Sequence, residues 1–506
     1  MPATPSSGSP VAPVHHRGSE GPDGGSRVLP GPILHHGGEN RENAWIIPAI
    51  IGAVVVAAVL LGSARMATVA GTFLQLLFLA FFIRHLTFAA AALSSAGADL
   101  DAPLLDNGHR PSVSVLVACK NEEAVVANLT TSLLALDYPP DLIQLIVVND
   151  GSTDHTGAIL DEAAARDSRL HPLHRRPGAG GGKSGALNEG LSSATGEIVI
   201  IFDADHRPRP DVVRRHVRHF SDPAVGAVQG RCEIANGGDS PLATLVAVDY
   251  LAGYLVNEYG RQAVFHLPAY GGANCAVRAT MLRSLGGWNP RSVTEDTDLT
   301  LRLLLSGARV RYDVTAVDEE EGVVTFDHYW SQRYRWARGH QQVWRDYRRA
   351  VWRSERLTRS EKLETTMFLY AFHLPVLSML GMLFLLAWFG GIVTPVGSSW
   401  LFVFTTLLFL GPLTEVGGGL ILARADRRLA LSLVWFLPLF FVSMAVSAKA
   451  WIDGIAGRPY AWVKTQRAAD GWDPAVPPDS RVPLAAPSGT STLLPAPTRT
   501  SQGGTR

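Results

Sequence analysis

Five long apolar runs lie on either side of a more polar middle in this chain of 506 residues. Two runs precede the middle, at 45–62 and 67–83, and three follow it, at 366–391, 400–422 and 429 to about 448. Each is about as long as a helix needs to cross a hydrocarbon core about 30 Å thick. One such run also suits the core helix of a soluble protein, but five around one hydrophilic block predict an integral membrane protein.

Basic residues indicate the side of the membrane on which the polar middle lies. Eight arginines stand between Arg333 and Lys362, next to the third apolar run, and the loop at 423–428 is also basic. Because short cytosolic loops are enriched in lysine and arginine, we expect the middle and the N-terminus in the cytosol. Three spans after the middle would place the C-terminus outside. An interfacial last run would leave it inside, where Lys464 and Arg467 are well suited.

Composition adds three limits to this picture. The 45 basic and 45 acidic residues leave no net charge, so nothing indicates a nucleic-acid partner. Residues 1–40 and 473–506 are rich in small residues and proline and are predicted to be disordered, and no cleavable signal is expected. Cys119, Cys232 and Cys275 lack CxxC spacing, which argues against a disulfide framework or a zinc site and agrees with a reducing compartment.

The polar middle repeats one pattern three times, at 112–121, 142–156 and 197–208. In each repeat a buried, β-rich run ends in polar or turn residues. Continuous apolar strands that alternate with helices indicate a parallel sheet covered on both faces. Ligands of such sheets bind beyond the carboxyl ends of the strands, which is where these polar residues stand.

Two of the three predicted strands end in carboxylates. Asp203 and Asp205 form a DxD pair after the run IVIIF, and carboxylates at this spacing suit Mg²⁺ or Mn²⁺ bound to a diphosphate. A lone DxD is a weak signal, and its position at a strand end strengthens it. Asp150, at the end of LIVVND, suits a nucleotide base or ribose, although NDGSTD is also ordinary turn chemistry.

Two further motifs lie near helix starts. The glycine-rich segment 178–188 carries Lys183, but Pro177 stands where the phosphate-binding GxxxxGK[ST] loop needs glycine, so a flexible loop that brings Lys183 to a diphosphate fits better. The motif TED contains Asp296 before an evident helix, where a carboxylate is commonly a cap. It also suits a general base that accepts the proton of an acceptor hydroxyl. One base opposite a metal-stabilised leaving group predicts a single, inverting displacement.

The motif QRYRW occupies residues 332–336. On a helix Gln332, Arg335 and Trp336 share one face, which offers an amide, a guanidinium for phosphate oxygens and an aromatic surface for a sugar ring. The alternative is an amphipathic helix on the membrane surface, and we expect both features in one helix.

The order Asp150, DADH, TED and QRYRW resembles the family-2 membrane glycosyltransferases, which include cellulose, chitin, hyaluronan and poly-N-acetylglucosamine synthases. The likeness covers roughly residues 111–467 and implies a GT-A-like α/β domain, with a mixed, mostly parallel sheet, inserted between transmembrane helices. It also implies a UDP-sugar donor, Mg²⁺ or Mn²⁺, and a multi-pass protein of the plasma membrane. Candidate partners are a glycan or lipid-linked acceptor, the bilayer and an accessory secretion subunit.

The resemblance also assigns roles to individual residues. Asp296 is the expected base, with Glu295 beside it in the catalytic pair, and Asp203 and Asp205 are the expected metal and diphosphate ligands. The remaining candidates are expected to bind the substrates. They are Glu122, Asp150, Lys183, Gly272, Gln332, Arg333, Arg335 and Trp336.

The expected domain order follows from these observations. Two transmembrane helices at 45–92 precede a cytosolic catalytic domain at 105–345 and a basic interfacial segment at 346–365. About three transmembrane or interfacial helices at 366–452 and a membrane-proximal segment at 453–472 come next. The leading expectation is a processive polysaccharide synthase, the alternative is transfer of one sugar to a lipid or protein, and a non-catalytic membrane subunit is less favoured. Arg333 favours N-acetylglucosamine and DADH favours glucose, so the sugar stays open.

Overall fold

A computed structural model describes residues 63–269, 271–389, 411–426 and 433–458 of the chain, together with residues 429 and 431. The apolar run predicted at 45–62 lies outside the described residues. So do both predicted disordered tails, the first part of the run at 400–422 and most of the segment at 453–472.

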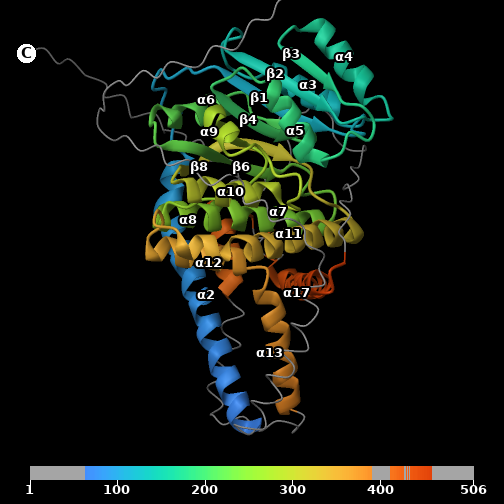
Figure 1. Cartoon of the computed structure of the whole chain (residues 1–506). Helices are drawn as coiled ribbons and strands as arrows, with labels where there is room; N and C mark the ends of the chain where they lie inside the picture. Colours follow the sequence, from blue (N-terminus) through green and yellow to red (C-terminus); the bar gives the residue numbers. More distant parts are fainter. Residues whose placement is uncertain are drawn as a thin grey trace, which may run out of the picture. The chain divides into compact units, whose positions relative to one another are not determined.

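The polar middle of the chain is built on a mixed eight-stranded sheet with the order β3-β2-β1-β4-β7-β6-β8-β5 (Figure 1). The three predicted strands, β2, β1 and β4, are parallel as expected, and β3, which was not predicted, continues the parallel part of the sheet. By contrast, β7 is antiparallel to both of its neighbours and β5 is antiparallel to β8. The strands are β1 Val113–Cys119, β2 Ile143–Asn149, β3 Leu170–His174, β4 Ile198–Asp203, β5 Arg207–Pro208, β6 Val225–Ile234, β7 Cys275–Arg278 and β8 Arg309–Glu320.

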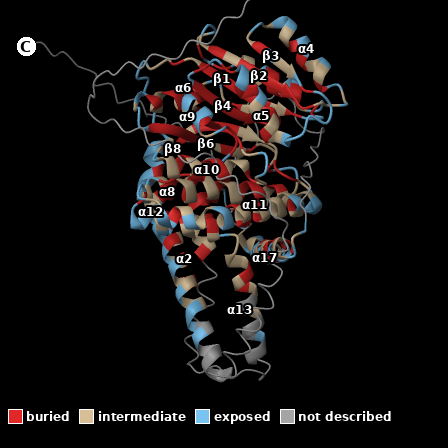
Figure 2. Ribbon diagram, in the orientation of Figure 1, coloured by how far each residue is buried: buried red, intermediate tan, exposed pale blue. Residues whose placement is uncertain are grey.

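Helices cover both faces of this sheet because its central strands are apolar on both sides. In β1, Val115 and Val117 pack with α3 and α6 on one face, whereas Leu116 packs with α5 and α10 on the other. The central strands are accordingly buried except near their carboxyl ends, where Ala118 and Asp203 are partly exposed (Figure 2). The covering helices are α3 Val126–Leu134, α4 Thr156–Arg166, α5 Gly182–Ser193, α6 Val212–Val217 with the 3₁₀ turn Arg218–Ser221, α9 Ala279–Ser284 and α10 Glu295–Ser306.

A second group of helices packs against the β6–β8 side of the domain and against one another. Three elements of this group, α7, the π-helix η3 and α8, follow one another without a break, so a π-helical segment lies inside one longer helix. The group comprises α2 Ser63–Leu100, α7 Pro241–Leu251, η3 Ala252–Glu258, α8 Tyr259–Phe265, α11 Phe326–Arg353, α12 Arg359–Tyr370, α13 Leu374–Phe389, α15 Gly411–Leu422 and α17 Leu433–Ile455.

Two helices among the described residues are long and apolar enough to cross a membrane, namely Thr72–Leu100 within α2 and the whole of α17. Helix α2 continues through Arg84, where the second apolar run ends, as far as Leu100. The reason is pairing, because Arg84 lies 2.8 Å from Glu364 of α12 and His85 lies 2.7 Å from Glu415 of α15. The predicted run at 366–391 is also interrupted, since α12 ends at Tyr370 and α13 begins at Leu374.

Candidate active site

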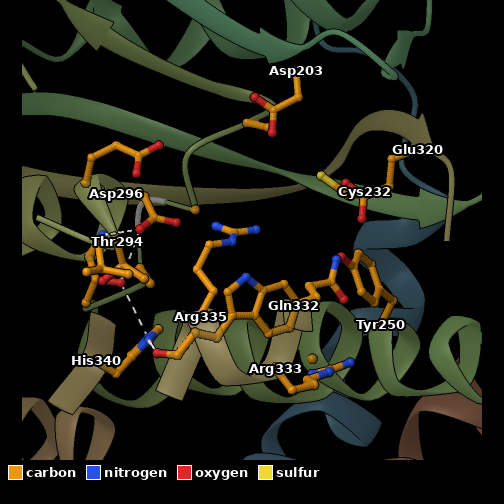
Figure 3. Close-up of a pocket in the computed structure, with 18 of the residues that line it drawn as sticks. Asp203, Cys232, Tyr250, Thr294, Asp296, Glu320, Gln332, Arg333, Arg335 and His340 are labelled. Carbon is orange, nitrogen blue, oxygen red and sulfur yellow. Dashed lines mark hydrogen bonds between the residues drawn. The ribbon is translucent and has the colours of Figure 1, made fainter. Parts of the chain in front are cut away.

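One large cavity of about 1360 Å³ opens at the carboxyl ends of β1, β2 and β4 (Figure 3). Its walls come from the sheet domain and from the helices α7, η3, α11, α12, α15 and α17. Eleven of the twelve residues predicted for the site line this cavity. They are Glu122, Asp150, Lys183, Asp203, Asp205, Glu295, Asp296, Gln332, Arg333, Arg335 and Trp336.

Gly272 is the exception, because Gly271 and Ala273 line the cavity while Gly272 lies behind it against Asp296. Its φ is +81°, and a Cβ at this position would lie 3.0 Å from the Cβ of Asp296 and 3.1 Å from its Oδ2. Glycine is therefore required here both for the left-handed backbone and for room beside the carboxylate.

Lys183 joins the two carboxylate motifs of the site. It follows a loop in which Gly178, Gly180 and Gly181 have φ of +76° to +77°, and it begins helix α5. Its Nζ lies 2.5 Å from Oδ1 of Asp203 and 3.5 Å from Oε1 of Glu295. Burial opposes charge on Lys183, but these carboxylates outweigh it and raise the pKa of the ammonium.

Glu295 and Asp296 occupy the first turn of α10, where the helix dipole favours negative charge. Oδ1 of Asp296 accepts a hydrogen bond of 2.6 Å from the backbone N–H of Thr297. Burial raises the pKa of the Asp296 carboxyl, and that hydrogen bond and the charge of Lys183 offset it only in part. Burial likewise raises the pKa of Glu295, so the first turn of α10 holds two carboxyls that are costly to ionise together.

The DxD carboxylates supply an oxygen donor set at the end of β4. Asp203 is one-third exposed towards the cavity, and Asp205 is buried in its wall. Oxygen donors of this kind fit Mg²⁺ or Mn²⁺.

A second group of residues that could bind a metal ion lies nearby, but its histidine is already paired with neighbouring carboxylates. His206, Cys232 and Asp318 place their donor atoms within 4.8 Å of one another. Both ring nitrogens of His206 are, however, already engaged, Nδ1 by Asp318 and Nε2 by Glu320 at 2.8 Å. We therefore interpret this group as a buried ion-pair cluster that anchors the end of the DxD motif to β8.

Asp150 directly follows β2 and is buried against Arg175, a residue that was not predicted from the sequence. Oδ1 of Asp150 pairs with Arg175, and Oδ2 lies 3.6 Å from Nζ of Lys120. Arg175 also donates to the carbonyl oxygen of Gly180 at 2.9 Å, so one guanidinium links Asp150 to the glycine loop. Nothing in the sequence pointed to Arg175, because the short strand β3 that it follows was not predicted either.

The QRYRW motif lies in α11, as predicted. Figure 3 shows the guanidinium of Arg335 pointing from α11 towards Asp296 and Asp203. Arg333 also lines the cavity, but its charge is engaged, because it lies 2.6 Å from Asp249 of α7 and 4.5 Å from the centre of the Trp336 ring. The guanidinium of Arg333 therefore lies between Asp249 of α7 and the ring of Trp336, which belongs to α11 like Arg333 itself.

His340, one turn after Trp336, was also missed by the sequence reasoning. Its Nε2 lies 3.4 Å from Oγ1 of Thr297, and its Nδ1 lies 3.0 Å from the carbonyl oxygen of Trp336. Burial lowers the pKa of His340 to about 4, so the ring is neutral at neutral pH. It links α11 to the residue that follows Asp296.

A mixed sheet of this order, with a DxD motif at the end of β4 and a carboxylate pair facing it, defines a GT-A-like glycosyltransferase fold. Residues 114–283 match the model of glycosyl transferase family 2. The chain therefore carries a family 2 glycosyltransferase domain.

Three known proteins show how far the likeness extends. The chain is 40% identical over 249 residues to a β-monoglucosyldiacylglycerol synthase of Synechocystis, covering 48% of this chain and 50% of the relative. It is 29% identical over 238 residues to a poly-β-1,6-N-acetyl-D-glucosamine synthase of Staphylococcus epidermidis, covering 46% and 56%. The match thus spans about half the length of these relatives.

The third is a solved structure, a mannosyltransferase of Pyrobaculum calidifontis in complex with GDP-mannose and Mn²⁺. It superimposes with a TM-score of 0.53 at 21% identity and covers 76% of this chain and all of that one. This likeness supports the fold.

Proposed function

We propose that this protein transfers one hexose from a UDP-sugar to the hydroxyl of a membrane lipid, with inversion at the anomeric carbon. The observation that carries the proposal is the meeting of Asp296 with the DxD carboxylates in one cavity, with Lys183 between them. This is the arrangement that a base opposite a bound diphosphate leaving group requires.

The donor half of the cavity is proposed to hold the nucleotide diphosphate. Asp150, fixed by Arg175, faces the base or ribose. Asp203 and Asp205 would hold Mg²⁺ or Mn²⁺, which supplies positive charge for the diphosphate when it is bound. Lys183 and Arg335 add two cations for phosphate oxygens, and Glu122 and Gln332 complete the polar wall around the sugar.

Asp296 is proposed to act on the acceptor. Its carboxylate accepts the proton of the acceptor hydroxyl while that oxygen forms a bond to C1 of the sugar and the bond from C1 to the diphosphate oxygen breaks. UDP leaves on the opposite face, so one displacement inverts the anomeric carbon. Trp336 offers a flat apolar surface for the sugar ring, and Glu295 adds negative charge beside the base.

The relatives favour a lipid acceptor over a growing polysaccharide. The proteins matched at 39% to 40% identity are named for the synthesis of monoglucosyldiacylglycerol, while the poly-N-acetylglucosamine synthases match at 27% to 29%. The leading expectation from the sequence, a processive synthase with a secretion subunit, therefore becomes the second candidate, supported by those weaker matches and by QRYRW.

We also propose that the protein is held in the plasma membrane by several passes, with its catalytic domain in the cytosol. Large apolar side chains are exposed on both candidate spans, for example Phe73 at 63% on α2 and Trp435 at 65% on α17. Such surfaces are costly in water and favourable in a bilayer.

A panel of radiolabelled nucleotide sugars tests the proposed reaction. Purified protein with Mn²⁺ and diacylglycerol in detergent micelles should transfer label from one UDP-hexose, UDP-glucose first among them, and release UDP. Asp296→Asn should lose transfer at unchanged expression. Transfer from no member of the panel, or normal transfer by the Asp296→Asn variant, would contradict the proposal.

A further inference from the structure

The cavity continues beyond the catalytic residues into a part with apolar walls. Figure 3 shows Tyr250, at the end of α7, on the opposite side of the cavity from Asp296. The turn that follows Tyr250 is the π-helix η3, which forms one wall, and α15 and α17 form the others. We call this part the apolar arm; it is lined by Ala252, Gly253, Val416, Phe436, Leu439 and Phe440.

Direct packing among η3, α15 and α17 holds the walls of the arm in place. Ala252, Val416 and Phe436 belong to one packed cluster, so η3, α15 and α17 meet there. Gly419 of α15 packs directly on η3, because a Cβ on it would lie 2.9 Å from the backbone nitrogen of Ala252. A π-helical turn inside a longer helix frequently marks a functional site.

The charges around the arm suit a neutral occupant. Among the described lining residues of η3, α15 and α17 there is no lysine or arginine. The carboxylate of Glu415 is matched by His85 at 2.7 Å and by the side-chain amide of Asn257 at 3.1 Å. The carboxylate of Glu258, which lines the cavity from η3, pairs with Arg261 at 3.2 Å. A phosphate headgroup would therefore find no cation here, whereas a neutral lipid carries no charge that needs one.

Helix α17 connects the arm with the outer surface of the protein. Phe436, Leu439 and Phe440 line the cavity, while the neighbouring Val434 and Trp435 are 70% and 65% exposed. The same helix therefore presents apolar side chains both to the cavity and to its surroundings. That arrangement suits a helix past which a hydrocarbon chain enters from a bilayer.

We infer that the apolar arm binds a hydrocarbon chain of the acceptor, a neutral lipid with one free hydroxyl such as a diacylglycerol. With its chain in the arm, the hydroxyl end of the lipid lies in the polar half of the cavity that contains Asp296. Each methylene that leaves water for the arm favours binding. The inference rests on the proposed lipid acceptor and adds where and by which residues that acceptor is held.

Gly253 offers a substitution that fills the arm without disturbing the fold. A Cβ on Gly253 meets nothing within 4 Å, and the residue lines the cavity from within a helix. Gly253→Leu therefore extends a side chain into the arm. Gly417→Leu is the matched control, because Gly417 lies in α15, also has open space around its Cβ, and is not among the lining residues.

The first measurement compares kcat/KM for dioleoylglycerol with that for dibutyrylglycerol, whose chains are too short to fill the arm. We expect Gly253→Leu to lower the ratio of long-chain to short-chain activity at least tenfold, and Gly417→Leu to leave it within twofold of the parent. An unchanged ratio in Gly253→Leu, or an equal loss with both acceptors, would overturn the inference.

The second measurement does not need turnover, so it separates failure of the arm from failure of the proposed function. A diacylglycerol with a photoreactive diazirine in one chain is irradiated with the full-length protein, and labelled peptides are mapped. Labelling of α17 at Phe436–Phe440 that is lost in Gly253→Leu and kept in Gly417→Leu supports the arm even if no sugar is transferred. Equal labelling in Gly253→Leu, or competition by an oligosaccharide instead of by unlabelled diacylglycerol, would overturn it.

Discussion

Nζ of Lys183 lies 2.5 Å from Oδ1 of Asp203, so the positive charge next to the DxD motif comes from the protein itself. The same ammonium lies 3.5 Å from Glu295 in the motif that contains the proposed base. Lys183 thus connects the proposed metal-binding and base motifs, which are about ninety residues apart in the sequence. In the proposed reaction the Lys183 ammonium would contact the diphosphate beside the bound metal ion.

Loss of the Lys183 ammonium is expected to weaken donor binding. Lys183→Met should raise the KM for the UDP-sugar by about ten- to a hundredfold, since a hydrogen bond to a charged group contributes about 1.5–3 kcal/mol. Steady-state kinetics at saturating acceptor measures the change. Lys362→Met in α12, outside the cavity lining, is the control and should be neutral. An unchanged KM in Lys183→Met would contradict the assigned contact with the diphosphate.

Asp296→Asn and Asp298→Asn, two positions apart in α10, should affect different properties, the first variant its turnover and the second its thermal stability. Asp296→Asn should lower kcat by about 10²- to 10⁴-fold with little change in Tm, because it removes a general base. Asp298 is buried, pairs with Arg302 at 2.7 Å and accepts a hydrogen bond from Tyr347 at 2.8 Å. Its replacement should lower Tm while the folded fraction keeps its kcat. Turnover and thermal unfolding of both variants check this, and equal kcat losses would count against the base assignment.

The rate should depend on pH through the raised pKa of the Glu295–Asp296 pair. Burial raises the pKa of both carboxyls above the ordinary value of about 4. The base works ionised, so kcat should rise with pH and its acidic limb should lie above pH 4. Lys183 lowers the pKa of Asp296, and Lys183→Met should therefore move that limb to higher pH. A limb that shifts downwards in this variant would be inconsistent with the assignment.

The same raised pKa fixes the sign of the effect on stability. An acid whose pKa is higher in the folded than in the unfolded state stabilises the fold below its unfolded pKa, and this contribution is lost as pH rises through the folded pKa. The contribution of Glu295 and Asp296 to the free energy of unfolding of the metal-free protein should therefore fall as pH rises through their folded pKa. Carboxyls with a lowered pKa, such as Asp313, contribute the opposite slope, so the variant is compared with the parent at each pH. In denaturant titrations Asp296→Asn should gain stability relative to the parent as pH rises, and a difference that does not change with pH would refute the link.

Metal removal should abolish transfer reversibly. EDTA is expected to stop turnover, and Mn²⁺ or Mg²⁺ should restore it, because the DxD carboxylates alone leave the diphosphate charge uncompensated. Asp205→Asn should raise the Mn²⁺ concentration for half-maximal activity by about tenfold or more. Glu233→Gln is a suitable control, since Glu233 pairs with Arg209 and is not a lining residue. Full activity in EDTA would contradict the proposed requirement for a divalent metal ion.

The sequence predicted the parts of the fold in which local pattern and environment agree. β1, β2 and β4 were each recognised from an apolar run that ends in polar residues, and both faces of these strands are buried. The short strand β3, with the sequence LHPLH, lacks that pattern and was missed. The apolar run at 67–83 did not reveal how α2 accommodates Arg84 and His85, because their partners Glu364 and Glu415 come from distant segments.

The sequence predicted eleven of the residues that line the site, including its carboxylates, but not their contacts. Asp203, Asp296 and Arg335 belong to motifs whose order is informative, and they meet in the cavity. Arg175 and Asp249 stand in no motif, and their roles come only from the partners to which the fold brings them. The apolar arm was equally hidden, since η3 is far apart in the chain from α15 and α17, which form its other walls.

Product analysis tests the central claim most directly. Full-length protein in vesicles that contain dioleoylglycerol is supplied with radiolabelled UDP-glucose and Mn²⁺, and the products are separated by thin-layer chromatography and mass spectrometry. The account predicts one organic-soluble product, a diacylglycerol that carries a single hexose in the β configuration, and no labelled polymer. Label in a long, water-soluble glycan that forms equally well without dioleoylglycerol would contradict it.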